Sequence, residues 1–482
     1  MKNIYIKIAS LMLTSLLVFT SCETDLDINR NPDLLSPDQI PMASEMPAAI
    51  TGIGATTGSY YAVIGGFWSQ FWTQSAVANQ YKIIDDYSLN SSSGINSGGW
   101  SAMYDALTDV RNIKANALAQ ENWNYYLIAT TLEVQASQVL VDLYGEIPYT
   151  EANNTAILNP VYDSAESVYD KMVIDLKDAL SKDLSLSPIE NVPGSSDFIF
   201  GGNMNNWKKF ANTLLLKIYL RQSEVRPSVA QNGVISLINS GAQFLSSDAA
   251  ITQFVDEDSR SNPLFESDRR QLNVGTNLRA SSTMGSFLTT NSDPRLAEFY
   301  DGTTFQHQGD FVDGSGNASV VILSPTDAVY FISLAESKFI QAEAAVRYMG
   351  GANAQTLYEE GVTAAFDQWG LDASSFITGA YAFPNGTNAE NIEAIITQKW
   401  VASFPGNGFE SFIEQNRTGY PKTSDVDQAD PSYVPGQFAY SVEGKTSGLF
   451  PKRLEFPLSE KQRNSNTPAI IKGTEPVWYD AN

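Results

Sequence analysis

Apolar residues recur every three to four positions through most of the chain, which is the period of an amphipathic α-helix. Stripes with this period occupy residues 106–117, 132–143, 165–179, 207–218, 335–346, 358–369 and 392–400. Asp163, with Glu166 three residues later, has the spacing of a helix-capping arrangement and predicts where the third helix begins. The pattern predicts an all-α protein.

The segment 331–370 predicts two antiparallel helices joined by a tight turn. Gly350 and Gly351 end the first helix, and Gly370 ends the second. Alanines at positions such as Ala342 and Ala365 permit the two axes to approach closely. This is the form of a tetratricopeptide-like helix pair, although no clean repeat consensus accompanies it.

Four long stretches rich in Asn, Ser and Gly have little helical pattern. They are residues 90–99, 189–206, 256–294 and 301–326. Loops of this length in a compact protein are usually functional or mobile. We therefore expect the helices to form a scaffold and the irregular insertions to carry the ligand contacts.

The first residues are typical of a secretory signal peptide. Lys2 and Lys7 precede an apolar run at 8–20, which is followed by Ser21 and Cys22. The run is shorter than the roughly 20 apolar residues of a membrane-spanning helix, which makes an N-terminal anchor helix the weaker alternative.

Cys22 is the only cysteine of the 482 residues, so an internal disulfide is excluded. Its position directly after the signal peptide predicts cleavage before Cys22 and acylation of that residue, although Phe19 replaces the commoner Leu. Two or three acyl chains hold a protein at a membrane, since each buried methylene contributes about 0.8 kcal/mol. The expected organisation is a signal peptide at 1–21, a lipidated tether and extended lead-in at 22–41, and a helical domain with loop insertions at 42–482.

Composition narrows the class of partner. The formal net charge of −24 repels phosphate backbones and argues against nucleic acid. Aromatic residues make up 11% of the chain, which suits stacking on sugars or peptides without establishing either.

Catalytic motifs are weak, and we expect no enzyme. His307 is the only histidine and lies in a segment without a nucleophile motif, so triads and His/Cys zinc sites find no support. Glu336 and Glu343 share a helical face, where structural hydrogen bonds are commoner than a glycosidase carboxylate pair. No cofactor is expected; the acidic run at 256–258 is either a solvated turn or, as the lesser alternative, a calcium site.

Aromatic residues supply the candidate ligand contacts. Trp68 and Trp72 are four apart, which predicts one face of a helix, and such stripes are usually core. Tyr81 and Tyr87 flank the point where a helix meets the Asn/Ser-rich loop, so they either touch ligand or anchor that loop. The candidate binding residues, two of them in the 256–294 insertion, are Trp72, Tyr81, Tyr87, Arg279 and Phe287.

Several motifs, spread in order over most of the chain, carry a family resemblance. They lie at 26–32, 141–151, 206–212, 293–296, 335–344, 398–400, 417–421, 451–453, 456–457 and 477–480. Together they resemble the SusD/RagB family of Bacteroidetes surface lipoproteins, within it the SusD-like subgroup. No single motif is decisive, but their number, order and spacing are unusual by chance.

The resemblance implies a SusD-like fold of tetratricopeptide-like helix pairs with an irregular ligand-binding half. It also implies a lipid-anchored protein of the outer membrane, facing the cell surface, that captures an oligosaccharide for a SusC-like TonB-dependent transporter. Glu23, Asp25 and Asp27 look like the export signal of such lipoproteins, with looser spacing. We expect Trp400 and Arg417, which lie in the motifs, to belong to the scaffold.

Three alternatives stay open on the sequence. An oligopeptide ligand, as in the RagB branch, keeps the same lid role over the transporter. An enzyme and a purely structural repeat adaptor are the others. The sequence specifies neither the ligand nor the partner transporter.

Overall fold

The computed structural model describes residues 40–187, 193–272 and 277–480. The chain separates into two units, Met1–Pro41 and Met42–Asn482, and every helix and strand of the described residues belongs to the second. The predicted signal peptide and Cys22 lie outside the described residues. Within those residues, no helix combines the length and the apolar character needed to cross a membrane.

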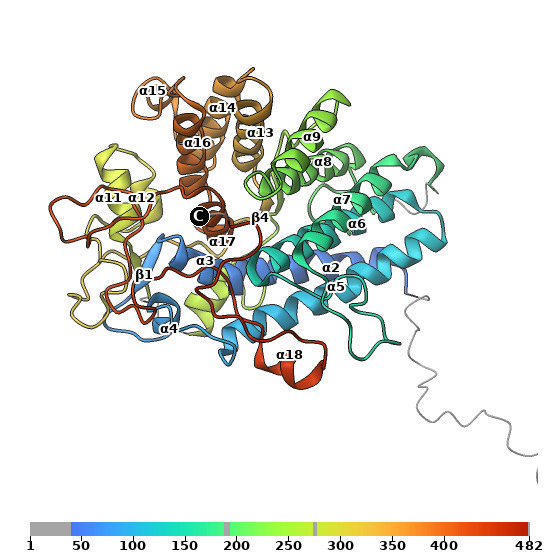
Figure 1. Ribbon diagram of the computed structural model, residues 1–482, viewed down its shortest axis with the longest axis horizontal. Coiled ribbons are helices and arrows are strands. Elements are labelled where there is room, and N and C mark those ends of the chain that lie inside the picture. Colours follow the sequence, from blue (N-terminus) through green and yellow to red (C-terminus); the bar gives the residue numbers. More distant parts are fainter. Residues whose placement is uncertain (1–39, 188–192, 273–276, 481–482) are drawn as a thin grey trace, which may run out of the picture. The chain divides into compact units, whose positions relative to one another are not determined.

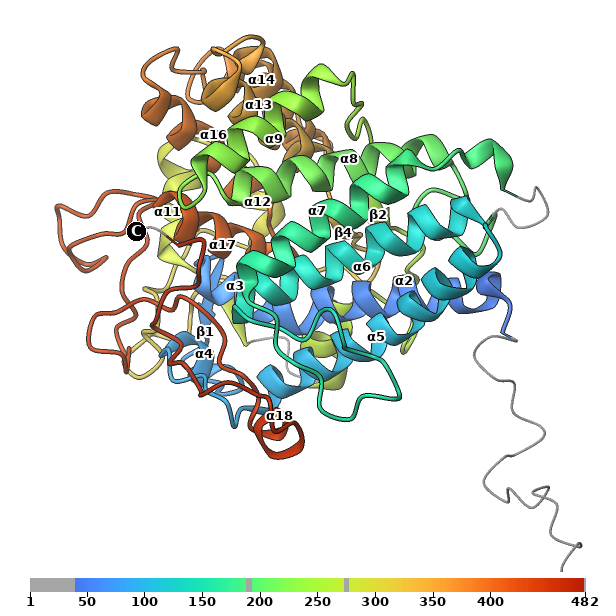
Figure 2. The same cartoon turned by 45° about the vertical axis from the view of Figure 1, so that its right-hand side comes forward.

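A run of long helices forms the first part of the fold. They are α2 (Met42–Thr56), α5 (Gly94–Ala119), α6 (Trp123–Tyr144), α7 (Ala165–Ser181), α8 (Met204–Arg221) and α9 (Pro227–Asn239). Each packs on the one before it, and Figure 2 shows α2, α5, α6, α7 and α8 side by side. Helix α6 is the central member: nearly all of its side chains are buried.

A second group of helices begins with the predicted hairpin. Its members are α13 (Leu334–Tyr348), α14 (Ala354–Asp367), α16 (Asn388–Ala402) and α17 (Gly408–Thr418). Helices α13 and α14 pack closely because Phe339 lies against Gly361, where a Cβ would meet its ring at 2.7 Å. These two helices and α16 enclose an apolar core of their own. The helices predicted from periodicity are confirmed in both groups.

The remaining elements are short, and many of them gather in an irregular half at the left of Figure 1. The helical ones are η2 (Thr57–Tyr61), α3 (Ala62–Trp68), α4 (Lys82–Asp85), η3 (Leu184–Leu186), α10 (Pro263–Phe265), η5 (Glu266–Gln271), α11 (Ser282–Thr290), α12 (Leu296–Phe299), α15 (Ser374–Ile377) and α18 (Leu458–Arg463). The strands form two antiparallel pairs, β1 (Trp72–Gln74) with β3 (Leu278–Ala280) and β2 (Ala249–Ile251) with β4 (Val329–Ile332). The all-α class with irregular insertions is confirmed.

Two sequence predictions about helix starts were wrong. Helix α5 begins at Gly94, inside the stretch 90–99 that was expected to be irregular. Buried Asn96 explains this, since its side chain donates to the Glu455 carbonyl at 2.7 Å and accepts from the Tyr144 hydroxyl at 2.8 Å. Tertiary packing therefore overrides the low helix propensity of that stretch.

The second concerns the cap of α7. The capping residue is Ser164, whose Oγ accepts from the Ser167 amide at 3.3 Å, and not Asp163. The Asp163 carboxylate instead accepts from the amides of Tyr149 and Thr150, at 3.0 and 2.8 Å. It therefore anchors the loop that enters the helix.

Candidate functional site

A buried network of charges occupies the centre of the scaffold. Its cations and carboxylates come from α6, α8, α13, α16 and α17, and none exposes more than 6% of its side chain. The members are Asp142, Lys217, Arg221, Glu336, Glu343, Lys399, Glu410, Glu414 and Arg417. Every member has at least one partner of opposite charge, so the network joins five helices.

Glu336 and Glu343 share one face of α13 because both belong to this network. Glu336 lies 3.1 Å from Lys217 Nζ, and Glu343 lies 2.7 Å from Arg417 Nη1. Burial raises the pKa of Glu343, but Arg417 and Arg347 outweigh it, and the pKa lies below its ordinary value. A carboxylate held ionised by buried cations suits helix packing, as the sequence interpretation expected, and not general acid catalysis.

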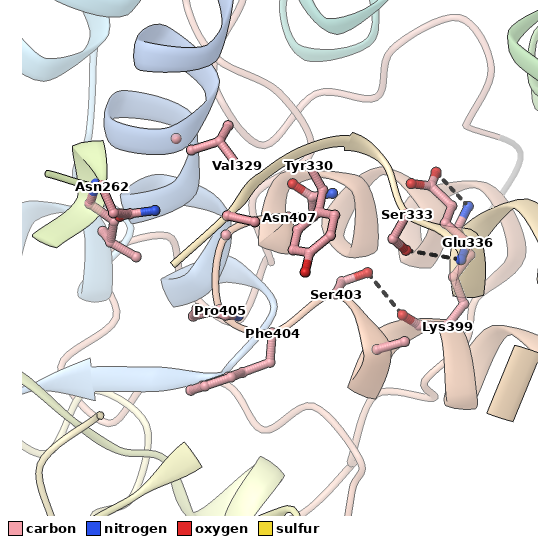
Figure 3. A pocket seen from close by; sticks show the side chains of 15 residues that line it. Asn262, Val329, Tyr330, Ser333, Glu336, Lys399, Ser403, Phe404, Pro405 and Asn407 are labelled. Atoms are coloured by element: carbon pink, nitrogen blue, oxygen red, sulfur yellow. Dashed lines mark hydrogen bonds and ion pairs between the residues drawn. The ribbon is translucent and has the colours of Figure 1, made fainter. Parts of the chain in front are cut away.

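A small enclosed cavity borders the network (Figure 3). Figure 3 shows Tyr330, Ser333 and Ser403 around it, with Glu336 and Lys399 at one wall. Its volume is about 30 Å³, and one water needs roughly 10–15 Å³ in this measure. The cavity therefore has room for about two waters and is too small for a sugar or a peptide side chain.

Trp68 and Trp72 do not share a helix, so that prediction was wrong. Helix α3 ends at Trp68 because Gln70 adopts a left-handed φ of 53° and the Phe71 amide returns to the Gly66 carbonyl at 2.9 Å. Trp72 begins β1 and is fully buried. Its ring meets Phe67, Phe71 and Phe404 edge-on, with ring centroids 6.0 to 6.4 Å apart, which places it in the core.

A buried polar cluster ties β1 to the 301–326 insertion. The Asp85 carboxylate accepts from Thr73 Oγ1 and the Gln74 amide, both at 2.7 Å, and from the Gln308 side chain. The Gln74 side chain in turn accepts from the Tyr81 amide at 2.7 Å. Burial raises the pKa of Asp85 to about 7, against the lowering effect of these hydrogen bonds. The cluster thus fixes the backbone that carries Tyr81.

Tyr81 lines an open hollow of about 340 Å³, called the Tyr81 hollow below. Its lining consists of Ser59, Tyr60, Val63, Gln80, Tyr81, Ile95, Ser267, Gln271 and Leu272. Tyr81 itself is held against Phe67, with ring centroids 5.7 Å apart, and only 6% of it is exposed. Burial raises its pKa to about 12, so its hydroxyl stays protonated and can donate a hydrogen bond.

Tyr60, the second ring of the hollow, was not found from the sequence. Its ring packs against α5 at Gly98, where a Cβ would meet that ring at 2.7 Å. Ser59 and Tyr60 lie on η2 and Ser267 and Gln271 on η5, and both segments are π-helical. Single π-helical turns are rare and frequently mark functional sites, and the sequence gives no signal for them.

Tyr87 lines a different hollow, of about 270 Å³, so the two tyrosines that the sequence grouped do not share a site. Its ring packs on Tyr440 and Phe450, with centroids 5.5 and 6.2 Å away. This hollow also contains the charged side chains of Arg453, Glu455 and Lys472. These two ring contacts hold the loop that carries Tyr87.

Arg279 and Phe287 lie in packing positions. Arg279 is 8% exposed and donates from Nη1 to the Ala318 carbonyl at 2.6 Å, which joins β3 to the 301–326 insertion. Phe287, on α11, stacks parallel to Tyr381 at 6.1 Å and meets Trp400 edge-on at 5.5 Å. Neither lines the Tyr81 hollow, so of the candidate residues only Tyr81 does.

The acidic run at 256–258 is paired with arginines. Asp258 lies 3.1 Å from Arg270 Nη1, Asp256 contacts the same guanidinium, and Glu257 lies 2.5 Å from Arg260. Within the described parts of the chain, no group of three metal-ligating side chains comes together. These contacts support the solvated-turn interpretation over a calcium site.

The motif residues Trp400 and Arg417 are scaffold, as expected. The Trp400 indole donates to the Ser69 carbonyl at 2.8 Å, and Arg417 is fully buried in the charge network. His307 lies in a loop, with Nδ1 3.9 Å from Asp427. This contact joins two loops, and its partner is a carboxylate and not a Ser or Cys nucleophile.

Comparison with known proteins gives one family and one fold. Residues 37–441 match the model of the SusD-like family described as "Starch-binding associating with outer membrane". A search of curated proteins found no match. The matched range covers every helix except α18 among the described residues, both strand pairs and the whole of the Tyr81 hollow.

Solved structures agree with the fold. A chitin-binding SusD homolog from Flavobacterium johnsoniae superposes with a TM-score of 0.72 at 22% identity, covering 91% of this chain and 99% of that one. SusD homologs from Bacteroides uniformis and Bacteroides thetaiotaomicron give TM-scores of 0.70 and 0.69, at 22% and 20% identity and with the same coverage. At these identities the likeness establishes the fold and not the ligand.

Proposed function

Because the chain belongs to the SusD-like family, described as starch-binding and associating with the outer membrane, we propose that it captures an oligosaccharide at the cell surface. It would hand the oligosaccharide to a partner TonB-dependent outer-membrane transporter and leave it chemically intact. The family match over residues 37–441 is the observation that carries this proposal.

The Tyr81 hollow is our proposed contact site for the sugar. Tyr60 and Tyr81 offer two aromatic rings, and Gln80 and Gln271 offer amide donors and acceptors. Sugar rings stack their C–H faces on aromatic rings while their hydroxyls bond to such groups. The composition of the hollow therefore suits a sugar, and its place between η2 and η5 puts it on the irregular half.

Binding without catalysis agrees with the family, whose members are non-catalytic binding proteins. Within the described residues, the lining of the Tyr81 hollow contains no carboxylate, histidine or cysteine. Hydrolysis of a glycosidic bond ordinarily needs two carboxyl groups flanking that bond. The hollow has the groups to hold a sugar but not those to cleave it.

The anchor is a proposal as well. We retain acylated Cys22 as the link to the outer membrane, with residues 22–41 as the tether to the helical domain that begins near residue 42. The weak affinity of a shallow sugar site becomes useful when the receptor stays beside its transporter, since tethering raises the effective concentration of cargo.

A glycan array run beside a peptide-library pull-down tests the proposed ligand class. We expect the purified protein to retain oligosaccharides with dissociation constants from about micromolar to millimolar. A chitin-binding homologue of the same fold supports the sugar over the peptide. Retention of peptides alone would reject the sugar and favour the oligopeptide alternative with the same lid role.

A further inference from the structure

The residues that line the Tyr81 hollow are uncharged. Its lining, within the described residues, carries hydroxyl, amide, aromatic and aliphatic side chains but no ionised group. The charged residues of η5 have partners of their own: Arg269 donates to the Val321 carbonyl at 2.9 Å and pairs with Asp268, and Glu266 lies 3.4 Å from Arg270. Arg269 also lowers the pKa of Tyr81 by its charge, although burial outweighs that effect. Taking an ion out of water without a partner is costly, so a carboxylated, sulfated or amino sugar would be disfavoured here.

The hollow also has an apolar wall. Val63, Ile95 and Leu272 line it together with the two tyrosine rings. Val63 comes from α3 and Ile95 from the first turn of α5, whereas Leu272 follows η5. A sugar that carries only hydroxyl groups would have to bring polar groups against these aliphatic side chains, and each polar group left without a hydrogen bond costs free energy.

Amide side chains accompany the apolar wall. Gln80 and Gln271 are both exposed, and each can donate and accept hydrogen bonds. An acetamido group pairs a methyl with an amide N–H and C=O. The methyl suits the wall of Val63, Ile95 and Leu272, and the amide suits the two glutamines.

We propose that the Tyr81 hollow selects uncharged sugars that carry an acetamido group. This inference rests on the proposed function and names the sugar class for the same site. Selection has two parts: the neutral lining excludes charged sugars, and the wall with its glutamines distinguishes an acetamido group from a hydroxyl.

Three β-1,4-linked tetrasaccharides with the same backbone test this selection by calorimetric titration. Chitotetraose carries acetamido groups, cellotetraose carries hydroxyls at the same positions, and fully deacetylated chitosan tetraose carries charged amines. We expect chitotetraose to bind at least about tenfold more tightly than either of the others, which corresponds to about 1.4 kcal/mol.

Two variants assign the preference to this hollow. Gln271→Leu replaces the amide with an aliphatic side chain, and Ile95→Asn makes the wall polar. Each should reduce the preference for chitotetraose over cellotetraose to about threefold or less. Gln120→Leu, at the exposed end of α5, is the matched control and should keep the wild-type preference.

The outcomes separate the two proposals. Equal binding of chitotetraose and cellotetraose would overturn the selection for acetamido groups and leave the proposed sugar binding intact. Binding of none of the three tetrasaccharides, together with retention of other neutral glycans on the array, would overturn the selection alone. Retention of no glycan at all would overturn both. A wild-type preference in both Gln271→Leu and Ile95→Asn would reject this hollow as its source.

Discussion

Asp85 is a buried carboxyl group that is linked through Gln74 to the backbone of Tyr81, and its protonation affects stability. Its side chain has no exposed surface and accepts hydrogen bonds from Thr73, Gln74 and Gln308. Burial raises its pKa to about 7, compared with about 3.9 in an unfolded chain. Between these pH values the native state holds a proton that the unfolded state releases, so the free energy of unfolding falls as pH rises from about 4 to 7.

Asp85→Asn should remove this dependence. The difference in unfolding free energy, variant minus wild type, should increase from pH 4 to pH 7, by on the order of 3 kcal/mol, because the wild type alone pays for a buried charge at neutral pH. Urea unfolding at several pH values measures this difference, and other titrating groups cancel in it. A difference that stays constant over this range would show that Asp85 titrates normally.

Glu414 is the opposite case, a buried carboxyl group whose pKa is depressed. Burial acts to raise it, but Arg417, Lys399 and Arg221 outweigh that effect, and the pKa lies well below its usual value. Its ionised form therefore contributes stability above the unfolded pKa of about 4.3, and this contribution is lost as pH falls through the native pKa. The buried charges of Arg417, Lys399 and Arg221 are compensated in part by this carboxylate.

Glu414→Gln should lower the free energy of unfolding at pH 7 by about 3–5 kcal/mol, because it leaves buried cations under-compensated. Glu393→Gln is the matched control, since Glu393 forms an exposed pair with Lys422 at 2.8 Å. That change should cost less than about 1 kcal/mol. Equal losses in the two variants, measured by urea unfolding, would contradict the importance of the buried network.

At the level of elements, α3 and α17 cross at two glycines. A Cβ on Gly65 would lie 2.0 Å from the Phe409 amide nitrogen and 2.5 Å from the Gly408 carbonyl carbon. These are backbone atoms, which cannot rotate away as a side chain would. The crossing therefore fixes α3, which contributes Val63 to the Tyr81 hollow, against α17 of the scaffold.

Gly65→Ala should therefore destabilise the protein by about 3 kcal/mol, even though alanine favours a helix by about 1 kcal/mol over glycine. Gly94→Ala, in the first turn of α5, is the control because nothing lies within 4 Å of its added Cβ. Thermal unfolding should place the Gly94→Ala variant at or above the wild type. A Gly65→Ala protein as stable as the wild type would disprove the tight crossing.

The elements that sequence could predict are those with long periodic patterns. The stripes at 132–143 and 335–346 fall within α6 and α13, because a repeated apolar face has to be buried in one way. The sequence did not predict the turn at Gln70, because the four-residue spacing of Trp68 and Trp72 is typical of a helix. Only packing in three dimensions ends α3 there. Short strands such as β1 also depend on partners about 200 residues away, in β3.

The proposed site was predicted only in part, because contacts between residues distant in sequence bring its lining together. Tyr81 was identified by its place beside a loop, whereas Tyr60 lies in a stretch whose π-helical turn leaves no periodic signal. Trp72 and Arg279 have the chemistry of ligand contacts, but neighbours distant in sequence bury them. Residue type identifies candidates, and the tertiary contacts decide which of them face a hollow.

At the level of the whole molecule, the proposed lipid attachment at Cys22 would determine where the protein acts. Cys22→Ser should move the protein from the membrane fraction to the soluble fraction, because the acyl chains have no other cysteine to bind. Cell fractionation with immunoblotting measures this, and mass spectrometry of the wild type should find the lipid on Cys22. A wild-type protein with an unmodified Cys22 would reject the anchor while leaving the sugar site untouched.

The central claim is that the Tyr81 hollow binds an oligosaccharide and leaves it intact. The most direct measurement is a calorimetric titration of the best array ligand into wild type, Tyr60→Ala/Tyr81→Ala, Gln80→Ala/Gln271→Ala and the control Tyr348→Ala, with circular dichroism to verify folding. Tyr348 is also partly exposed but lies on α13, away from the hollow.

At about 1 kcal/mol per lost ring, the tyrosine double variant should bind at least about 25-fold more weakly than the wild type. The glutamine double variant should also weaken binding, Tyr348→Ala should not, and mass spectrometry should recover the ligand unchanged. Wild-type affinity in both folded double variants, or a shortened ligand after incubation, would contradict the account.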